Sequence, residues 1–249
     1  MADRVMGKSD LTLDDLILKK RKLWQPRKGY RMGLDAVLLS AFAAPEPGDL
    51  VADLGCGVGA VPLLLTARVP ETKVYGVEIQ AEMADLAKKN VRLNNLSSQV
   101  FIEQGDLTAI EEKWGLGHFD IVVSNPPYRI VGTGGRSPSM QRSIATEEIS
   151  CALPQVVRAA ARLVKPAGRV ALVYKQERLS ELISEFVNNR LRPVRLRFVH
   201  SQLEKPAELL LLEGEKQVNK RLVVEKPLIV YNDDGQYTAE MVEIFYGGD

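Results

Sequence analysis

An apolar strand that ends in three closely spaced glycines restricts the fold of this chain more than any other feature. Residues 50–54 are predicted to form a buried strand, Gly55, Gly57 and Gly59 follow it, and a helical stretch comes next. Glycine adopts positive φ angles and lets the backbone approach a ligand closely. After a strand of an open α/β sheet, such a turn is typical of a site for a nucleoside-containing cofactor. Gly55, Gly57 and Ala60 also fit the dinucleotide pattern G-x-G-x-x-G/A, so the turn alone does not choose between cofactors.

Apolar runs, turns and helical stretches alternate along the rest of the chain. The predicted strands cover residues 50–54, 73–77, 100–103, 118–124, 169–174, 195–199 and 207–212, and predicted helices cover 81–93, about 147–164 and 177–189. This alternation predicts an α/β fold with a mostly parallel sheet and helices on both faces. Only residues 201–206 separate the last two strands, which is too short for a crossover, so these two form an antiparallel edge hairpin. The expected sheet is therefore seven-stranded and Rossmann-like.

Three acidic residues near strand ends favour S-adenosylmethionine over a nicotinamide dinucleotide. Asp53 lies two residues before Gly55, where its carboxylate can face an ammonium group but would repel a pyrophosphate. Glu78 ends the second strand and can accept hydrogen bonds from both hydroxyls of a ribose. Asp106 follows the third strand and can accept a hydrogen bond from an adenine amine. A solvated strand end remains the alternative for Glu78, and a turn or helix cap for Asp106.

The segment after the fourth strand, Asn125-Pro126-Pro127-Tyr128, indicates the reaction. Two successive prolines remove two backbone donors and stiffen the chain, so the nearby carbonyls stay outside a regular ladder. The side-chain oxygen of Asn125 and the carbonyl of Pro126 can then accept the two N–H protons of an amine that is to be methylated. Tyr128 can stack on the planar group that carries this amine. These four residues are therefore the candidate catalytic residues.

The combination of VADLGCGVG, VYGVE, EQGD and DIVVSNPPY resembles the class I S-adenosylmethionine-dependent methyltransferases, in the branch that methylates amino groups. This branch acts on adenine N6, on guanine N2 and on the glutamine N5 of release factors. The resemblance implies S-adenosylmethionine as the cofactor. It implies a cofactor site at Gly33, Asp53, Gly55, Gly57, Gly59, Glu78, Asp106 and Asn125.

Basic residues gather before the glycine turn and after the fourth strand, although the net charge of the chain is only +1. Residues 10–32 are expected to form a short hairpin or arm on the main domain, which would then cover residues 33–249. A basic segment with interleaved Trp24 and Tyr30 suits a phosphate backbone, and a solvated face is the alternative. The candidate RNA-binding residues are Lys19, Lys20, Arg21, Lys22, Arg27, Lys28, Arg31, Arg129, Arg136 and Arg142.

The flanking segments GYRMGLDAVLLSAFA and RFVHSQLEKPAELLLLEG resemble the tRNA1(Val) adenine-N6 methyltransferases of bacteria. This resemblance implies a tRNA substrate, methylated on an unpaired adenine beside the valine anticodon. A base that is paired in a nucleic-acid duplex could not bring its amine into a buried methylation site without being flipped out. His200 lies near the final hairpin, where a structural role at a strand end is the simpler interpretation.

Composition sets the remaining expectations. No apolar run in the chain is long enough for a secretory signal or a membrane span, and the two cysteines lack metal-type spacing, so we expect a cytoplasmic protein without a metal. No protein partner is indicated. A glutamine-N5 or DNA adenine methyltransferase remains an alternative, although either would need a recognition domain that this chain lacks room for. An NAD-dependent oxidoreductase leaves Asn125–Tyr128 unexplained, and a non-catalytic RNA-binding module is disfavoured by the same segment.

Overall fold

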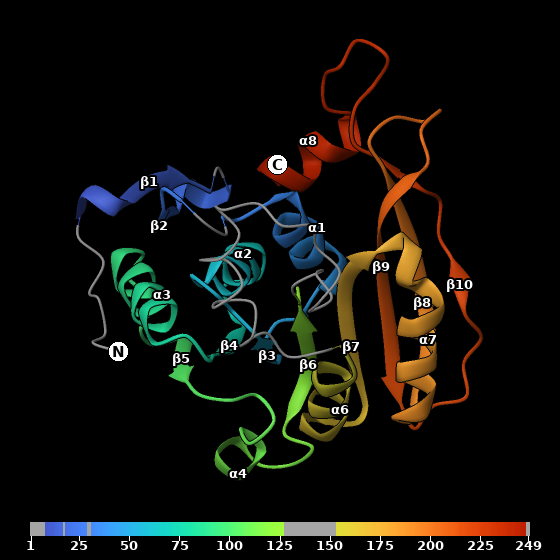
Figure 1. Cartoon of the computed structure of the whole chain (residues 1–249), viewed down its shortest axis with the longest axis horizontal. Coiled ribbons are helices and arrows are strands. Elements are labelled where there is room, and N and C mark those ends of the chain that lie inside the picture. Colours follow the sequence, from blue (N-terminus) through green and yellow to red (C-terminus); the bar gives the residue numbers. More distant parts are fainter. Residues whose placement is uncertain (1–7, 17, 29–30, 127–152, 248–249) are drawn as a thin grey trace, which may run out of the picture.

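The computed structural model describes residues 8–16, 18–28, 31–126 and 153–247, and these residues form an α/β fold around one large sheet (Figure 1). In the described part of the chain this sheet has nine strands, parallel except where β9 runs against β7 and β8. In spatial order the strands are β10 (Val223–Val224), β8 (Leu191–His200), β9 (Ala207–Lys216), β7 (Val164–Lys175), β6 (Phe119–Ser124), β3 (Leu50–Leu54), β4 (Lys73–Glu78) and β5 (Val100–Gln104), and β11 (Leu228–Ile229) also pairs with β8.

Helices cover both faces of the sheet (Figure 1), and the sheet separates the hydrophobic core into two clusters. On β7, Ala171 and Val173 face one layer, while Val170 and Leu172 face the other, as strand alternation requires. One layer contains α1 (Leu34–Ala43), α2 (Ala60–Arg68), α3 (Ala81–Leu93) and α8 (Ala239–Tyr246), and the other contains α4 (Glu111–Trp114), α6 (Leu153–Leu163) and α7 (Leu179–Asn188). None of these described helices combines the length and the apolar character that crossing a bilayer requires. The predicted Rossmann-like α/β architecture is confirmed.

The sheet differs from the prediction mainly around its antiparallel strands. β8 and β9 are ten residues each, several more than predicted, and β10 and β11 extend the sheet beyond β8. At the other end of β7, residues 165–168 bulge out between the pairs Phe119↔Val164 and Ile121↔Arg169. The strand therefore begins at Val164, directly after α6, instead of at the predicted residue 169. The predicted start of this helix, near residue 147, lies outside the described residues.

The N-terminal hairpin is present as predicted. β1 (Leu11–Asp15) pairs antiparallel with β2 (Lys22–Pro26), and a short 3-10 turn (Leu18–Lys20) joins them. Leu11, Leu18 and Leu23 are buried in the same cluster as α1, α2 and α3. The hairpin thus packs on the helical layer beside α2 and α3 (Figure 1).

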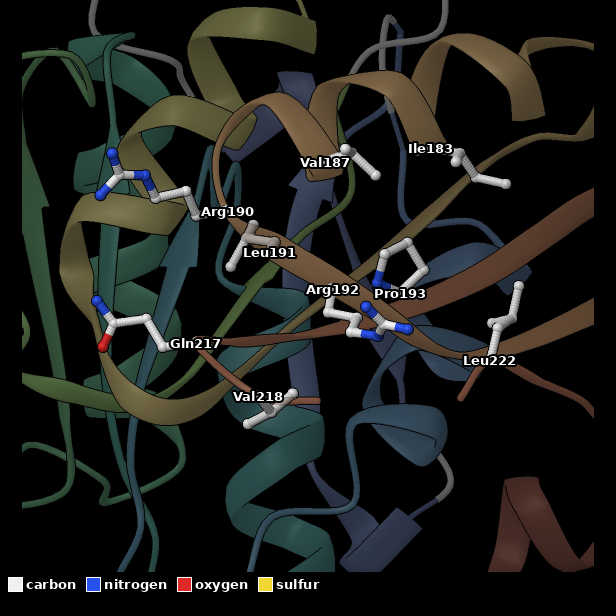
Figure 2. Close-up of a pocket in the computed structure, with 9 residues that line it drawn as sticks. All are labelled: Ile183, Val187, Arg190, Leu191, Arg192, Pro193, Gln217, Val218 and Leu222. Atoms are coloured by element: carbon white, nitrogen blue, oxygen red, sulfur yellow. The ribbon is translucent and has the colours of Figure 1, made fainter. Parts of the chain in front are cut away.

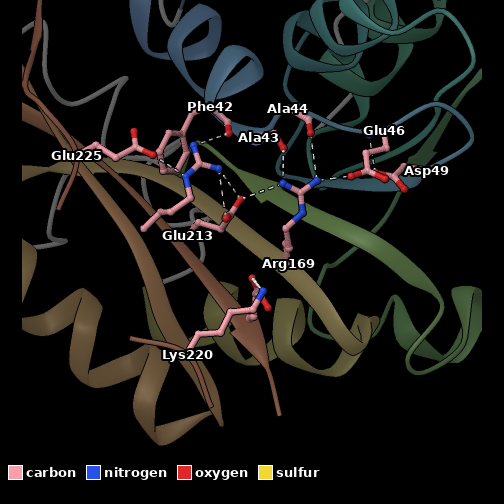
Figure 3. Close-up of polar contacts among 11 residues, drawn as sticks. Phe42, Ala43, Ala44, Glu46, Asp49, Arg169, Glu213, Lys220 and Glu225 are labelled. Atoms are coloured by element: carbon pink, nitrogen blue, oxygen red, sulfur yellow. Dashed lines mark hydrogen bonds and ion pairs between the residues drawn. The ribbon is translucent and has the colours of Figure 1, made fainter. Parts of the chain in front are cut away.

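Two arginines hold the end of α1 against the antiparallel strands (Figure 3). Arg169 donates to the carbonyls of Ala43 and Ala44, each at 3.1 Å, and Arg195 lies 4.3 Å over the ring of Phe42. Positive charge at a helix C-terminus is favourable because the last carbonyls lack intrahelical partners. The buried carboxylate of Glu213 lies between the two guanidinium groups, at 3.2 Å from Arg169 and 3.3 Å from Arg195.

We predict that Glu213→Gln destabilises the protein by about 3 kcal/mol, because two partly buried arginines lose their shared counter-ion. Glu208, on the same strand but exposed, provides the matched control. Glu208→Gln should change the free energy of unfolding by less than about 0.5 kcal/mol. Urea unfolding of both variants measures the difference, and equal stabilities would show that the network contributes nothing.

Candidate functional site

Four neighbouring parallel strands end at the same edge of the sheet. β6 lies beside β3, β3 beside β4, and β4 beside β5, with their carboxyl ends together. Hydrogen bonds connect these ends: Ser124 Oγ donates to the Leu54 carbonyl at 2.7 Å, and Gly105 N–H donates to the Glu78 carbonyl at 3.0 Å. Such an edge is where open α/β sheets bind their ligands. The residues that directly follow these strands are therefore neighbours in space.

The glycine turn between β3 and α2 has the backbone that its sequence requires. Gly55 and Gly57 lie at φ angles of +76° and +54°, and a Cβ added to either would meet nothing within 4 Å. Their backbone thus borders open space, where a ligand can approach the peptide groups directly. Gly59 serves packing instead, since a Cβ there would lie 3.2 Å from the Ala87 side chain on α3. Cys56, between Gly55 and Gly57, is a buried free thiol.

Asp53 is the unusual carboxylate of this site. It lies in β3, is 1% exposed, and its Oδ2 atom has no hydrogen-bond partner among the residues that the structure describes. Burial, together with the nearby charge of Glu78, raises the pKa of Asp53 to about 8. A buried polar atom without a partner is rare in folded proteins and costs free energy. Its presence two residues before Gly55 fits a site that is completed by a ligand with a cationic or donor group.

Glu78 is held in place by backbone amides. Its Oε2 accepts from Gly57 N–H and its Oε1 accepts from Gln80 N–H, each at 2.9 Å. Burial raises the pKa of Glu78, and the amide hydrogen bonds oppose this shift. Each carboxylate oxygen retains a further lone pair, so Glu78 can still accept hydrogen bonds from a pair of hydroxyl groups.

Asp106 and Gly33 occupy less specific environments. Asp106 is exposed in the turn after β5, where its Oδ1 accepts from the amide and hydroxyl of Thr108, each at 2.8 Å. Asp106 thus has the role in a turn that was the alternative interpretation of its sequence. The Oδ2 atom of Asp106 has no donor among the described residues. Gly33 precedes α1 as its N-terminal cap, where a Cβ would lie 2.6 Å from the Asp35 carboxylate. Neither position by itself identifies a ligand.

Asn125 and Pro126 follow β6 directly beside the glycine turn. In the β3–β6 register Asp53 pairs with Val123, so the next residues of β6 lead to the level of Gly55. Asn125 is half-buried and Pro126 is buried. Pro127, Tyr128, Arg129, Arg136 and Arg142 lie outside the described residues.

The basic hairpin separates into two kinds of residues. Lys19, Lys20, Lys22, Arg27 and Lys28 are exposed. Arg21 instead reaches α2, where it donates to the Leu63 carbonyl and to both the hydroxyl and the carbonyl of Thr66. Burial lowers the pKa of Arg21 to about 10.

Arg31 is also engaged within the hairpin. It pairs with Asp14 and donates to Thr12 Oγ1 at 3.0 Å. The sequence predicted RNA contacts for both Arg21 and Arg31, but their guanidinium groups have intramolecular partners that hold the hairpin. The pairing partners were not identified because they lie outside the run of basic residues.

Sequence reasoning missed two asparagines, one within α3 and one that caps its C-terminus. Asn90 and Asn94, one helical turn apart, bind the backbone of β2 at Trp24 and Lys22. Asn90 is fully buried. A buried asparagine on the apolar stripe of a predicted helix was the available signal, because such a side chain needs partners.

A groove among the described residues lies away from this edge. It has a volume of about 420 Å³ and is lined by residues at the end of α7, the start of β8 and the segment after β9, among them Val187, Leu191 and Leu222 (Figure 2). Since β8 runs parallel to β7, its start is at the opposite edge from the glycine turn. The groove is therefore not the candidate site. Within the described part of the chain, no three His, Cys, Asp or Glu side chains gather as metal ligands.

Comparison with known proteins agrees with this geometry. The model of a family described as "methyltransferase small domain" matches residues 34–192, from α1 to the start of β8. The chain belongs to this methyltransferase family. A relative from Porphyromonas gingivalis, named tRNA1(Val) (adenine(37)-N6)-methyltransferase, is 30% identical over 240 residues, 93% of each chain.

Solved structures show the same fold at lower identity. Protein Atu636 from Agrobacterium tumefaciens, described as a predicted O-methyltransferase, is 22% identical with a TM-score of 0.70, covering 86% of this chain and 96% of its own. A geranyl diphosphate C-methyltransferase from Streptomyces coelicolor, solved with S-adenosyl-L-homocysteine, is 15% identical with a TM-score of 0.54, over 74% and 78% of the two chains. These likenesses support the class I methyltransferase fold.

We predict that Asp53→Asn stabilises the ligand-free protein at pH 8 but leaves its stability at pH 4 nearly unchanged. Above the unfolded pKa of an aspartate, the folded wild type retains a proton that the unfolded chain has released, so its stability falls as pH rises. This group should lower the free energy of unfolding by about 1.4 kcal/mol per pH unit between roughly pH 4 and pH 8. Thermal unfolding of both proteins across this range measures the effect. A constant difference between them would show that Asp53 has an ordinary pKa.

Proposed function

We propose that this protein transfers the methyl group of S-adenosylmethionine to the exocyclic N6 amine of an unpaired adenine in tRNA, at the position beside the anticodon of valine tRNA. The observation that carries the proposal is the placement of Asn125 and Pro126 directly beside the glycine turn. A methylatable amine held there would lie next to a cofactor bound over Gly55 and Gly57.

The described residues fit this cofactor. Open space over Gly55 and Gly57 accommodates a nucleoside close to the backbone, and Glu78 offers acceptors for two ribose hydroxyls. The Oδ2 atom of Asp53 would gain a partner from the ammonium end of the cofactor, directly or through water. Asp106 offers an acceptor for the adenine amine. Gly33 and Gly59 remain proposed members of the site, at the start of α1 and of α2.

The chemistry asks little of the protein beyond orientation. The cofactor supplies an electrophilic methyl group on a sulfonium, so the protein needs no strong base. Asn125 Oδ1 and the Pro126 carbonyl would accept the two N–H bonds of the amine and turn its lone pair toward the methyl group. The same two oxygens would stabilise the positive charge that develops on the nitrogen. Pro127 and Tyr128, which follow directly, complete the proposed site by stiffening the segment and stacking on the base.

The relatives and the distribution of charge support a tRNA substrate. The Porphyromonas gingivalis relative is named for adenine 37 of tRNA1(Val), and this likeness covers almost the whole chain. The exposed lysines of the hairpin offer positive charge to an RNA backbone. In this proposal residues 1–32 form an RNA-binding arm on a methyltransferase domain of residues 33–249, and the protein acts in the cytoplasm.

We expect N6-methyladenosine to appear when unmodified bulk tRNA is incubated with the protein and S-adenosylmethionine. Nucleoside mass spectrometry detects it, and Asn125→Ala should reduce the rate about 100- to 1,000-fold because the amine loses an oriented acceptor. Cofactor affinity in this variant, measured by calorimetry, should stay within a few-fold of the wild type. If the protein binds the cofactor but tRNA stays unmethylated, the proposed substrate is excluded. If Asn125→Ala turns over at the normal rate, the proposed role of Asn125 is excluded.

The arm gives a second prediction. Replacing Lys19, Lys20 and Lys22 with glutamine should weaken tRNA binding and flatten its dependence on salt, by up to about 0.9 in log–log slope for each lost phosphate contact. The melting temperature of this triple variant should stay close to that of the wild type, because all three lysine side chains are exposed. Arg21→Gln is the contrasting variant and should lower the melting temperature. An unchanged salt slope would mean that the lysines are only a solvated face.

A further inference from the structure

Asn90 has no contact with solvent, and both the oxygen and the two N–H bonds of its side-chain amide have hydrogen-bond partners. Its Oδ1 accepts from Trp24 N–H at 2.8 Å, while its Nδ2 donates to the carbonyls of Trp24 and Val58, both at 2.9 Å. Trp24 belongs to β2 of the arm, and Val58 belongs to the glycine turn. One side chain of α3 thus joins the arm to the turn.

The glycine turn needs such external contacts. Gly55 and Gly57 impose few conformational limits of their own, so the shape of the turn depends on what holds its peptide groups. Glu78 holds the N–H of Gly57 at 2.9 Å, and Asn90 holds the carbonyl of Val58, the next residue. Val58 is 4% exposed, so its carbonyl would be left without a partner if Asn90 were replaced.

These contacts form a continuous series from the arm to the proposed ribose acceptor. It runs from the backbone of Trp24 through Asn90 to Val58, and from Gly57 to the carboxylate of Glu78. A ligand that fixes Glu78 and the turn would therefore also favour the position of Asn90 that binds β2.

We propose that Asn90 is a positioning residue that fixes the glycine turn and couples cofactor binding to docking of the RNA-binding arm. Binding of the cofactor then stabilises the docked arm, and the docked arm strengthens cofactor binding by the same factor, as linkage requires. This inference rests on the proposed function for the identity of the cofactor. It adds a residue that touches neither the cofactor nor the RNA.

Asn94 offers a matched control on the same helix. Its Oδ1 accepts from Lys22 N–H at 2.9 Å and its Nδ2 donates to the Lys22 carbonyl at 2.7 Å, so it holds β2 in the same manner. It also donates to the Asn90 backbone carbonyl, and none of its side-chain hydrogen bonds in the described structure reaches the glycine turn. Asn90→Leu and Asn94→Leu both weaken the arm, and only Asn90→Leu removes the contact with Val58.

Calorimetry with S-adenosylmethionine on the full chain tests the positioning role. We expect Asn90→Leu to raise the dissociation constant about tenfold. Asn94→Leu, whose arm stays docked through Asn90, should change it less than about twofold, although both variants lower the melting temperature. Equal effects of the two variants on cofactor affinity, or none in either, would overturn the inference. A wild type that fails to bind S-adenosylmethionine would instead refute the proposed function.

Hydrogen exchange of the wild type tests the coupling without any substitution. Saturating S-adenosylmethionine should slow exchange several-fold at the amides of Lys22 and Trp24, which hydrogen-bond to α3 rather than to β1. The same measurement on Asn90→Leu, where this variant folds, should show no slowing. If S-adenosylmethionine does not change the exchange rates of these amides in the wild type, the arm and the turn are independent. This result would hold even if Asn90→Leu cannot be purified.

Discussion

The parallel pairing of β6, β3, β4 and β5 is the constraint on which the candidate site depends. Parallel strands present their carboxyl ends at one edge, so a residue after each strand arrives at the same place without any long loop. The hydrogen bond from Ser124 to Leu54 and the one from Gly105 to Glu78 keep these ends level. Any register slip between β3 and β6 would separate Asn125 from the glycine turn, so the spacing of the site follows from the ladder itself.

Buried acidic side chains are treated in two different ways in this molecule. Where the fold alone requires a carboxylate, as at Glu213, two arginines surround it and also bind the end of α1. At the candidate site the carboxyl group of Asp53 is as deeply buried, but within the described part of the chain its Oδ2 has no partner. An arrangement that is unfavourable in the free protein persists when a bound ligand uses it. The contrast between these two residues distinguishes the site from the rest of the core.

The sequence predicted the parts of the fold that local patterns determine. The strand and turn around Gly55, the helices α2, α3 and α7 and the hairpin of β8 and β9 all have clear apolar periods or glycine and proline signals. β10 and β11 were not predicted because each is only two residues long and is defined by pairing with β8 rather than by its own composition. The structural roles of Arg21 and Arg31 escaped for a related reason, since Thr66 and Asp14 become their partners only through the tertiary fold.

The C-terminal helix α8 has a consequence for how the chain assembles. Met241 of α8 is buried in the cluster that contains Leu18 of the arm, and Arg68 on α2 donates to the Ile244 carbonyl at 2.7 Å. During synthesis the arm emerges before its partners on α2, α3 and α8. Its contacts with α2 and α3 involve residues up to about Asn94, whereas its contact with α8 can form only after residues more than 200 positions downstream have emerged. Packing of the arm is therefore completed only when the last helix is made.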